Sequence, residues 1–132
     1  MPQSPILAAS AFPLPAAAVS VTASSGNEAN TSAVATLAAA SGKTTWITGF
    51  TCTASGATAA SVVEVTVAGV ISGTMTFTFV APAGATTAAV PLAVAFPYPV
   101  PASAVNTAIV VTLPALGAGN TNASVVATGF QL

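Results

Sequence analysis

Very few side chains in this 132-residue sequence could take part in acid–base or nucleophilic chemistry. Only Glu28, Lys43 and Glu64 carry a formal charge, Cys52 is the one thiol, and there is no His, Asp or Arg. Acid–base and nucleophilic catalysis need a base beside the reacting group, and this thiol has no imidazole to serve as one. A metal cage needs several ligating side chains. We therefore predict no catalytic, cofactor-binding or metal-binding residues, no cofactor and no enzymatic activity.

The few candidate groups have ordinary structural interpretations. Glu28 and Glu64 are the one pair that could form a carboxylate site of the glycosidase type, but one falls in a turn-rich segment and the other in a strand-like one. Lys43 lies in a Gly-Lys-Thr sequence that resembles the end of a phosphate-binding loop, yet Leu37 occupies the position of the required first glycine. We expect Lys43 in a solvated turn and Cys52 as a small apolar side chain in a strand.

The elements that would position these groups are β-strands. Val and Thr are abundant and favour strands, and apolar residues alternate with polar ones between Gly, Pro and Asn clusters. Met75, Phe77 and Phe79 face one way and the intervening threonines face the other. A short Gly-flanked connection before them predicts a hairpin. The predicted strands are residues 19–23, 33–39, 45–53, 62–68, 74–80, 88–96, 105–113 and 122–130.

Two of these strands carry finer expectations. In residues 45–53, Trp46 and Phe50 fall on one face together with the thiol. In residues 105–113, Val110 interrupts the alternation, which indicates burial on both faces.

A third strand is interpreted from its prolines. In residues 88–96 the apolar side chains from Val90 to Phe96 share one face. Pro91 has no backbone N–H for a sheet ladder, which indicates an edge strand or a strand that begins there. Residues 96–101 contain three prolines and are interpreted as a long connecting loop.

About eight short strands separated by turn signals indicate one all-β domain, a single antiparallel β-sandwich or a barrel. The Cys, Trp and Cys spacing of immunoglobulin domains is absent, and long loops suit crossover connections better than the turns of an up-and-down barrel. We expect a jelly roll of about eight strands over residues 31–132. Residues 1–30, rich in Pro and Ala, are expected to form an extended N-terminal arm with one short strand.

The near absence of charge predicts self-association. Charged residues make up 2% of the chain, whereas a soluble domain usually covers itself with about 25% or more. Sheet edges are normally guarded by lysines or inward-pointing charges, and such guards are nearly absent from this chain. We predict a homo-oligomer, with a closed trimer favoured and the N-terminal arm docked on a neighbour. One lysine cannot displace the counterions of a nucleic acid, and no segment supplies the roughly 20 apolar residues of a membrane-spanning helix.

Four segments resemble small β-sandwich virion proteins of tailed bacteriophages, namely capsid decoration (cement) proteins and related head or tail accessory subunits. They are WITGF at 46–50, FPYP at 96–99, GAGNTN at 117–122 and the closing TGFQL at 128–132. The resemblance covers about the last hundred residues and consists of short Ala/Thr/Val strands with few charges. It implies a non-enzymatic structural protein of the virion, assembled in the cytoplasm of a host bacterium, that contacts the capsid or another virion protein.

The main alternative is a binding module that displays loops for glycan or receptor attachment. That role predicts Trp46, Phe96 or Tyr98 exposed in a concave patch, whereas a cement role predicts them in the core or under a neighbouring subunit. A secreted surface-layer or biofilm subunit is a third possibility, although residues 1–21 carry none of the basic residues of an export signal. An ice-binding face is a fourth, but the Thr row at 74, 76 and 78 has no equivalent on the next strand.

Overall fold

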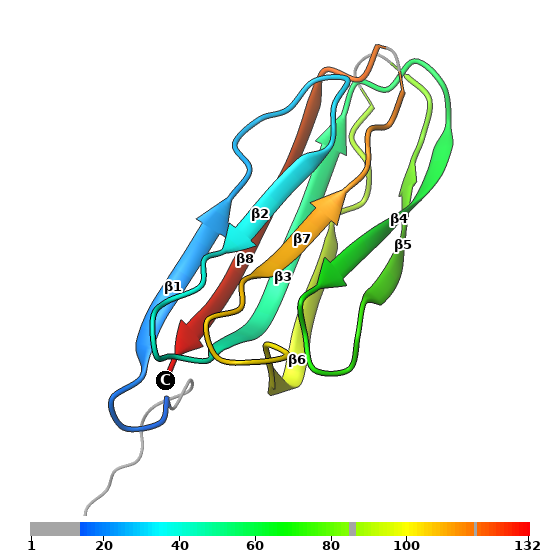
Figure 1. Ribbon diagram of the computed structural model, residues 1–132. Helices are drawn as coiled ribbons and strands as arrows, with labels where there is room; N and C mark the ends of the chain where they lie inside the picture. The colour runs from blue at the N-terminus through cyan, green and yellow to red at the C-terminus, as the bar shows by residue number, and fades with distance from the viewer. Residues whose placement is uncertain (1–13, 85–86, 118) are drawn as a thin grey trace, which may run out of the picture.

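Two four-stranded antiparallel sheets pack face to face in the computed structural model, which describes residues 14–84, 87–117 and 119–132 (Figure 1). The strand order is β1-β8-β3-β6 in one sheet and β2-β7-β4-β5 in the other. The strands are β1 Val19–Ser24, β2 Ala33–Leu37, β3 Thr45–Ser55, β4 Ser61–Ala68, β5 Met75–Ala81, β6 Leu92–Pro101, β7 Ile109–Leu113 and β8 Asn122–Gln131.

The strand pairs are nested. β4 pairs with β5, β3 with β6, β2 with β7, and β1 with β8, each pair antiparallel. A long hairpin of this kind, folded over into two sheets, is a jelly roll, and so the predicted fold is confirmed. Every predicted strand is present, although the bounds of several differ.

The first sheet begins inside the segment predicted as an arm. Residues 19–24 form β1, whose register with β8 runs without interruption from Val19 opposite Gln131 to Ser24 opposite Val126. The sandwich therefore includes residues well before 31. The part of the predicted arm at 1–13 lies outside the described residues.

Alternation along the strands builds the core between the sheets. In β7, Ile109, Val111 and Leu113 are fully buried while the residues between them are partly exposed. Each fully buried aliphatic side chain contributes about 1.5–3 kcal/mol relative to an exposed one. The expectation that Val110 would be buried on the opposite face was wrong, because the outer face of this sheet is not covered there. Val105 lies outside β7 and is half exposed.

A β-bulge in β3 reverses the expected facing of Trp46. The register against β8 shifts between Ile47 and Gly49, so Thr48 is the extra residue. Ile47 and Phe50 are thereby both buried in the core, and Trp46 points out of the opposite face. The extra residue changes the parity of the strand, which a uniform period of two does not anticipate.

β6 lies further along the chain than predicted. It spans Leu92–Pro101, so the proline-rich residues 96–101 are strand and not loop. The prolines are tolerated because β6 is an edge strand and half of its N–H positions need no partner. Ala102 donates its N–H to β3, whereas Pro101 faces the other way and its carbonyl accepts a hydrogen bond from Ile71. Pro91 was interpreted as a sign of an edge strand or of a strand that begins there, and β6 is an edge strand that begins at the next residue, Leu92.

The facing of Val90 was also wrong. Residues 89–91 lie outside β6, and the isolated bridge between Ser55 and Ala88 is out of step with the ladder that begins at Leu92. Ala89 is therefore buried and Val90 is 83% exposed.

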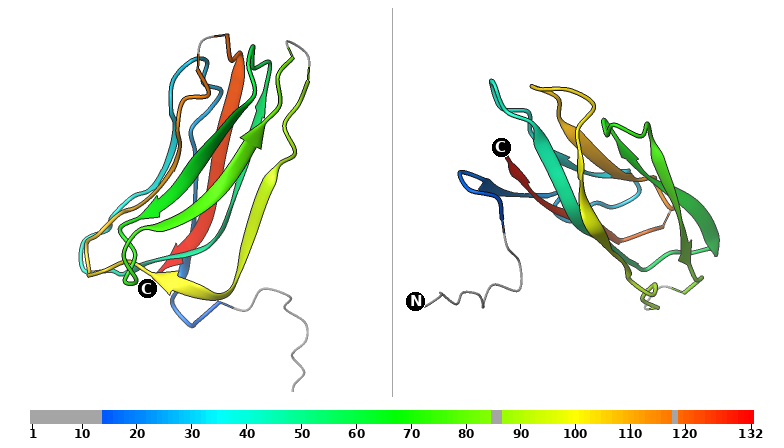
Figure 2. Two further views of the ribbon diagram at one scale, coloured as in Figure 1. Left: turned by 90° about the vertical axis from the view of Figure 1, so that its right-hand side faces the viewer. Right: turned by 90° about the horizontal axis from the view of Figure 1, so that it is seen from below.

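The sandwich is closed on one side and more open on the other. β1 packs beside β2, which follows it in the chain, whereas the backbones of β5 and β6 stay further apart. The left view of Figure 2 shows this second side facing the viewer, with β6 as a strand separate from β4 and β5. At the lower end the tip of the β4–β5 hairpin closes the gap, where Ser103 N–H donates to the Gly69 carbonyl at 2.8 Å.

Candidate interaction surfaces

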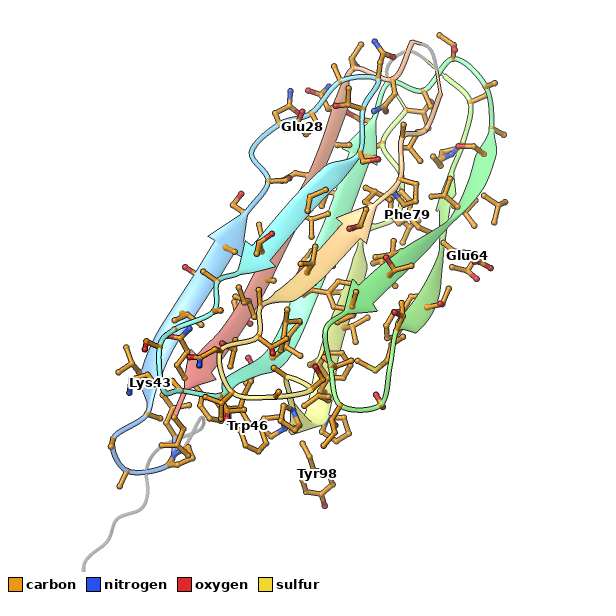
Figure 3. All side chains as sticks on the ribbon, viewed as in Figure 1. Glu28, Lys43, Trp46, Glu64, Phe79 and Tyr98 are labelled. Atoms are coloured by element: carbon orange, nitrogen blue, oxygen red, sulfur yellow. The ribbon has the colours of Figure 1, made fainter. Side chains whose placement is uncertain are left out.

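The two glutamates are not brought together. Glu28 lies between β1 and β2, where its backbone pairs with Ala123 and its carboxylate accepts a hydrogen bond from the Thr31 hydroxyl at 3.1 Å. Glu64 lies on the exposed face of β4. Figure 3 shows the two side chains on different sides of the sandwich. The arrangement does not provide a shared carboxylate site.

Lys43 lies in the turn between β2 and β3, as predicted. Gly42 has φ +72° and donates its N–H to the Asn106 side chain at 2.7 Å, and the Lys43 carbonyl accepts the N–H of Asn106 at 3.0 Å. A strand follows the turn, whereas a phosphate-binding loop leads into a helix, whose N-terminus holds the phosphate. The turn has a structural role in joining β2–β3 to the loop before β7.

Cys52 is fully buried in the middle of β3. Desolvation by burial raises the pKa of its thiol from 9.0 to about 12, because the charged thiolate is disfavoured in apolar surroundings. A thiol in this state is a poor nucleophile, so the interpretation of Cys52 as a small apolar side chain is confirmed.

An apolar strip follows the open side of the sandwich. Its centre is a cluster of three rings, in which Phe77 lies 5.2 Å from Phe50 and 6.4 Å from Phe96 between ring centroids. Phe50 belongs to the core, but the other two rings are only partly buried, because they sit on the edge strands. The side chains of the strip are Val63, Met75, Phe77, Leu92, Val94 and Phe96.

The aromatic residues that could have marked an attachment site have different environments. Trp46 is partly buried and stacks on Phe130, which stands opposite it in β8, with ring centroids 5.8 Å apart. Tyr98 is 82% exposed, as the labelled side chain in Figure 3 shows. Phe96 belongs to the apolar strip. Their placement thus matches neither the concave patch of a binding module nor full burial in the core.

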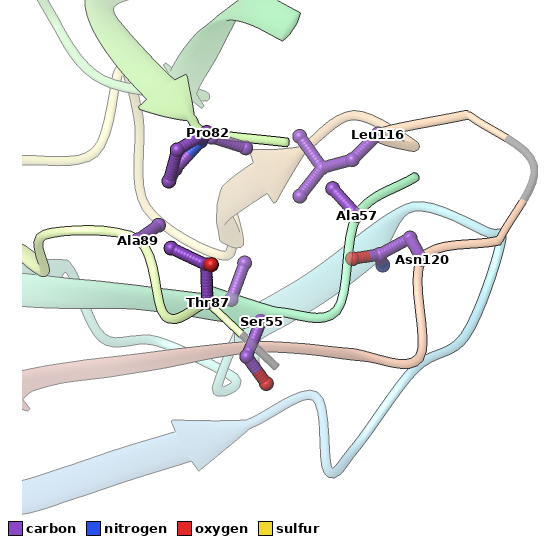
Figure 4. Close-up of a pocket in the computed structure, with 9 residues that line it drawn as sticks. Ser55, Ala57, Pro82, Thr87, Ala89, Leu116 and Asn120 are labelled. Atoms are coloured by element: carbon purple, nitrogen blue, oxygen red, sulfur yellow. The ribbon is translucent and has the colours of Figure 1, made fainter. Parts of the chain in front are cut away.

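Asn120 is a buried polar residue that the sequence did not single out. It is fully buried between the loops at the upper end of the sandwich, and no described residue hydrogen-bonds its side-chain amide. Figure 4 shows it close to Ala57 and Leu116. The space among these side chains does not admit a water molecule. Buried side-chain amides usually have hydrogen-bond partners, and Asn120 is one of the exceptions among the described residues.

A shallow depression of about 250 Å³ lies on the outer side of the first sheet at the same end. Its polar lining includes Asn122, whose amide donates to the hydroxyls of Ser55 and Thr121, both at 3.1 Å. The rest of the lining is Ala, Pro, Ser, Thr and one further Asn. The depression therefore offers hydrogen bonds but neither charge nor an aromatic ring.

Threonines are aligned across the outer face of the second sheet. Thr66 stands opposite Thr76 on β5 and Thr112 on β7, while Glu64 stands opposite Thr78. One row of three threonines therefore exists, but a carboxylate interrupts the next. This is not the regular array that an ice-binding face would need.

The described part of the chain contains no group of three His, Cys, Asp or Glu side chains that could hold a metal ion. Within the same residues, no helix is long and apolar enough to cross a membrane. Comparison of the chain with protein-family models, curated protein sequences and solved structures finds no match.

Proposed function

We propose that the chain is a non-enzymatic structural subunit of a bacteriophage particle. In this proposal it decorates or cements the capsid lattice through subunit–subunit contacts, after assembly in the cytoplasm of the host bacterium. The observation that carries the proposal is a sandwich with an almost uncharged surface. Apolar side chains are exposed on several elements, and with so little charge around them these faces are suited to contacts with other subunits. The most exposed are Val62, Ile71, Val80, Val90 and Tyr98.

The partners of such a subunit are copies of itself and a capsid or other virion protein. Uncharged faces lack the like-charge repulsion that keeps monomers apart, so self-association is the expected state. A closed ring of subunits covers those faces without forming an open-ended polymer, and we favour a trimer. With one lysine in the chain, neither nucleic acid nor a membrane surface is an expected partner.

The test is deletion of the gene from the phage that encodes it. We expect particles that still assemble but break at a lower temperature than the parent particles. Adding the purified chain back should restore the original breakage temperature and saturate at a fixed number of copies per particle. An unrelated protein of similar mass is the control. Absence of the chain from purified parent particles, measured by mass spectrometry, would contradict the proposal.

A receptor- or glycan-binding attachment module is the second candidate, and the 82% exposure of Tyr98 favours it. Exposed tyrosines beside prolines present a rigid ring on which a sugar can stack. Binding of the isolated protein to a glycan array, lost in Tyr98→Ala and retained in Tyr98→Phe, which keeps the ring, would support this role. The cement role instead predicts no glycan signal from either the parent chain or the variants.

A further inference from the structure

β5 is an edge strand whose free side has no protection against pairing. It lies at the end of the order β2-β7-β4-β5, and its register with β4 is uninterrupted from Ser61 opposite Ala81 to Val67 opposite Met75. The seven residues of the strand include no charge, proline or glycine and no bulge. Natural edge strands normally carry at least one of these devices, because an unpaired row of N–H and C=O groups is a template for another strand.

The other edge on the open side is protected in several ways. β6 contains Pro97, Pro99 and Pro101, and its ladder with β3 is broken by a register shift. Its last residues are also covered by the β4–β5 hairpin tip, where Ile71 N–H donates to the Pro101 carbonyl at 3.0 Å. On the opposite side of the sandwich, the edge strands β1 and β2 also contain no charge, proline or glycine, but their backbones lie close to each other, whereas β5 has no such neighbouring strand beyond its free edge. The contrast singles out β5 as the edge left for a partner.

We propose that β5 pairs antiparallel with β5 of a second copy of this chain across a two-fold axis, so that the two β2-β7-β4-β5 sheets become one sheet of eight strands. The strand is self-complementary in the register centred on Thr78, which pairs all seven residues. Thr78 then faces its own counterpart, Phe77 faces Phe79 of the second copy, and Thr76 faces Val80 of the second copy. Inner side chains meet inner ones and outer side chains meet outer ones.

Backbone and side chains both support this pairing. A fully paired seven-residue antiparallel ladder adds about six to eight backbone hydrogen bonds. Met75 and Phe77 are only partly buried because nothing lies beyond the free edge. The second copy would bring Ala81 and Phe79 alongside them and extend the apolar strip across the axis.

Electrostatics favours a second copy over a charged peptide. The one charged side chain near this edge is Glu64, which lies on β4 opposite Thr78. In the paired sheet the two Glu64 residues are separated by three strand spacings, about 14 Å. That exceeds the Debye length of about 8 Å at physiological ionic strength, so their repulsion is screened. An acidic or basic peptide would find no opposite charge along β5 itself.

This inference does not require the proposed virion role. A two-fold contact joins copies in pairs, and combined with a three-fold ring it would give an assembly of six. An even number of copies is therefore expected, whether the pair stands alone or is combined with a three-fold ring. A simple trimer would leave β5 unpaired.

The test uses charges placed at positions that only this register brings together. Thr76→Lys with Val80→Lys sets ammonium groups opposite each other twice across the axis, and both positions are exposed in the single chain. The matched control, Thr76→Lys with Val80→Glu, sets opposite charges at the same places. We expect the first variant to raise the dissociation constant measured by sedimentation about tenfold or more. The control should stay within about threefold of the parent chain.

Hydrogen–deuterium exchange of the full chain gives an independent readout. The β5 amides that point away from β4 should exchange slowly in the parent chain and the Lys/Glu variant, and rapidly in the Lys/Lys variant. Equal effects of the two variants, or fast exchange of these amides in an associated parent chain, would overturn the inference. A trimer with fast-exchanging β5 amides would overturn it while leaving the virion role intact. Protected β5 amides in a chain that is absent from phage particles would support the pairing of β5 and overturn the virion role.

Discussion

At the scale of single residues, burial decides what each polar group can do. Cys52 was predictable as a small apolar residue because it lies within an alternating strand and the sequence has no histidine to act as its base. Asn120 was not predictable, because its segment has the composition of an ordinary loop. Its burial results from loops that converge from distant parts of the chain, including those containing Ala57 and Leu116. Local composition contains no information about such convergence.

The Cys52 thiol makes stability depend on pH in the alkaline range. Its pKa is about 12 in the folded chain and near the ordinary 9.0 when unfolded, so the unfolded state loses the proton first. This contribution to stability is fully present below pH 9 and is lost by about 1.4 kcal/mol per pH unit between pH 9 and pH 12. Denaturant unfolding under reducing conditions at several pH values in that range measures the slope.

The control for this prediction is Cys52→Ala, which removes the titrating group from the same buried position. The free energy of unfolding of that variant should fall less steeply with pH than that of the parent chain. Identical slopes would show that the thiol does not contribute.

At the scale of elements, a period of two locates strands but not the irregularities within them. The hairpin of β4 and β5 was predicted with nearly correct bounds because its alternation is unbroken and its turn is bounded by glycines. β6 was misplaced because edge strands tolerate prolines that central strands do not. The facing of Trp46 was wrong because a bulge residue, Thr48, changes parity and leaves no signal in the pattern. Whether a strand is at an edge is a property of the whole sheet.

The bulge in β3 requires a small residue opposite it in β8. A Cβ atom at Gly129 would collide with the backbone carbonyl of Trp46, which cannot move without disturbing both strands. Gly129→Ala should therefore lower the free energy of unfolding by about 3 kcal/mol and shift the fluorescence of the single tryptophan. Thermal and denaturant unfolding measure the first effect.

The matched substitution is Gly117→Ala. Gly117 has φ +94° with no neighbouring atoms where a Cβ would lie, so it carries backbone strain without a collision. It should cost about 1 kcal/mol and leave tryptophan fluorescence unchanged. Equal losses in both variants would argue against a tight bulge.

At the scale of the whole molecule, the proposed contacts between copies would not depend on ion pairs. The three charged side chains are dispersed over the molecule, on the loops before β2 and β3 and on the face of β4. The proposed association would then come from apolar burial and backbone hydrogen bonds, which salt does not screen.

The dissociation constant should accordingly change by less than about threefold between 0.05 and 0.5 M sodium chloride. Ammonium sulfate should instead strengthen association, because excluded salts favour burial of apolar surface. Sedimentation equilibrium in the two salts measures both responses. A tenfold weakening by sodium chloride would mean that ion pairs hold the copies together.

Because the first strand pairs with the last, β1 cannot complete its sheet until β8 has been synthesised. Val19 finds its partner only when Gln131 is available. At about 5–20 residues per second, a ribosome needs about 5–20 s to translate the stretch between them. During that interval the uncharged β1 segment has no partner strand within its own chain. Until β8 has been made, pairing of β1 within its own chain competes with pairing to a neighbouring nascent chain. Slower translation of the later strands is therefore expected to lower the yield of correctly folded protein.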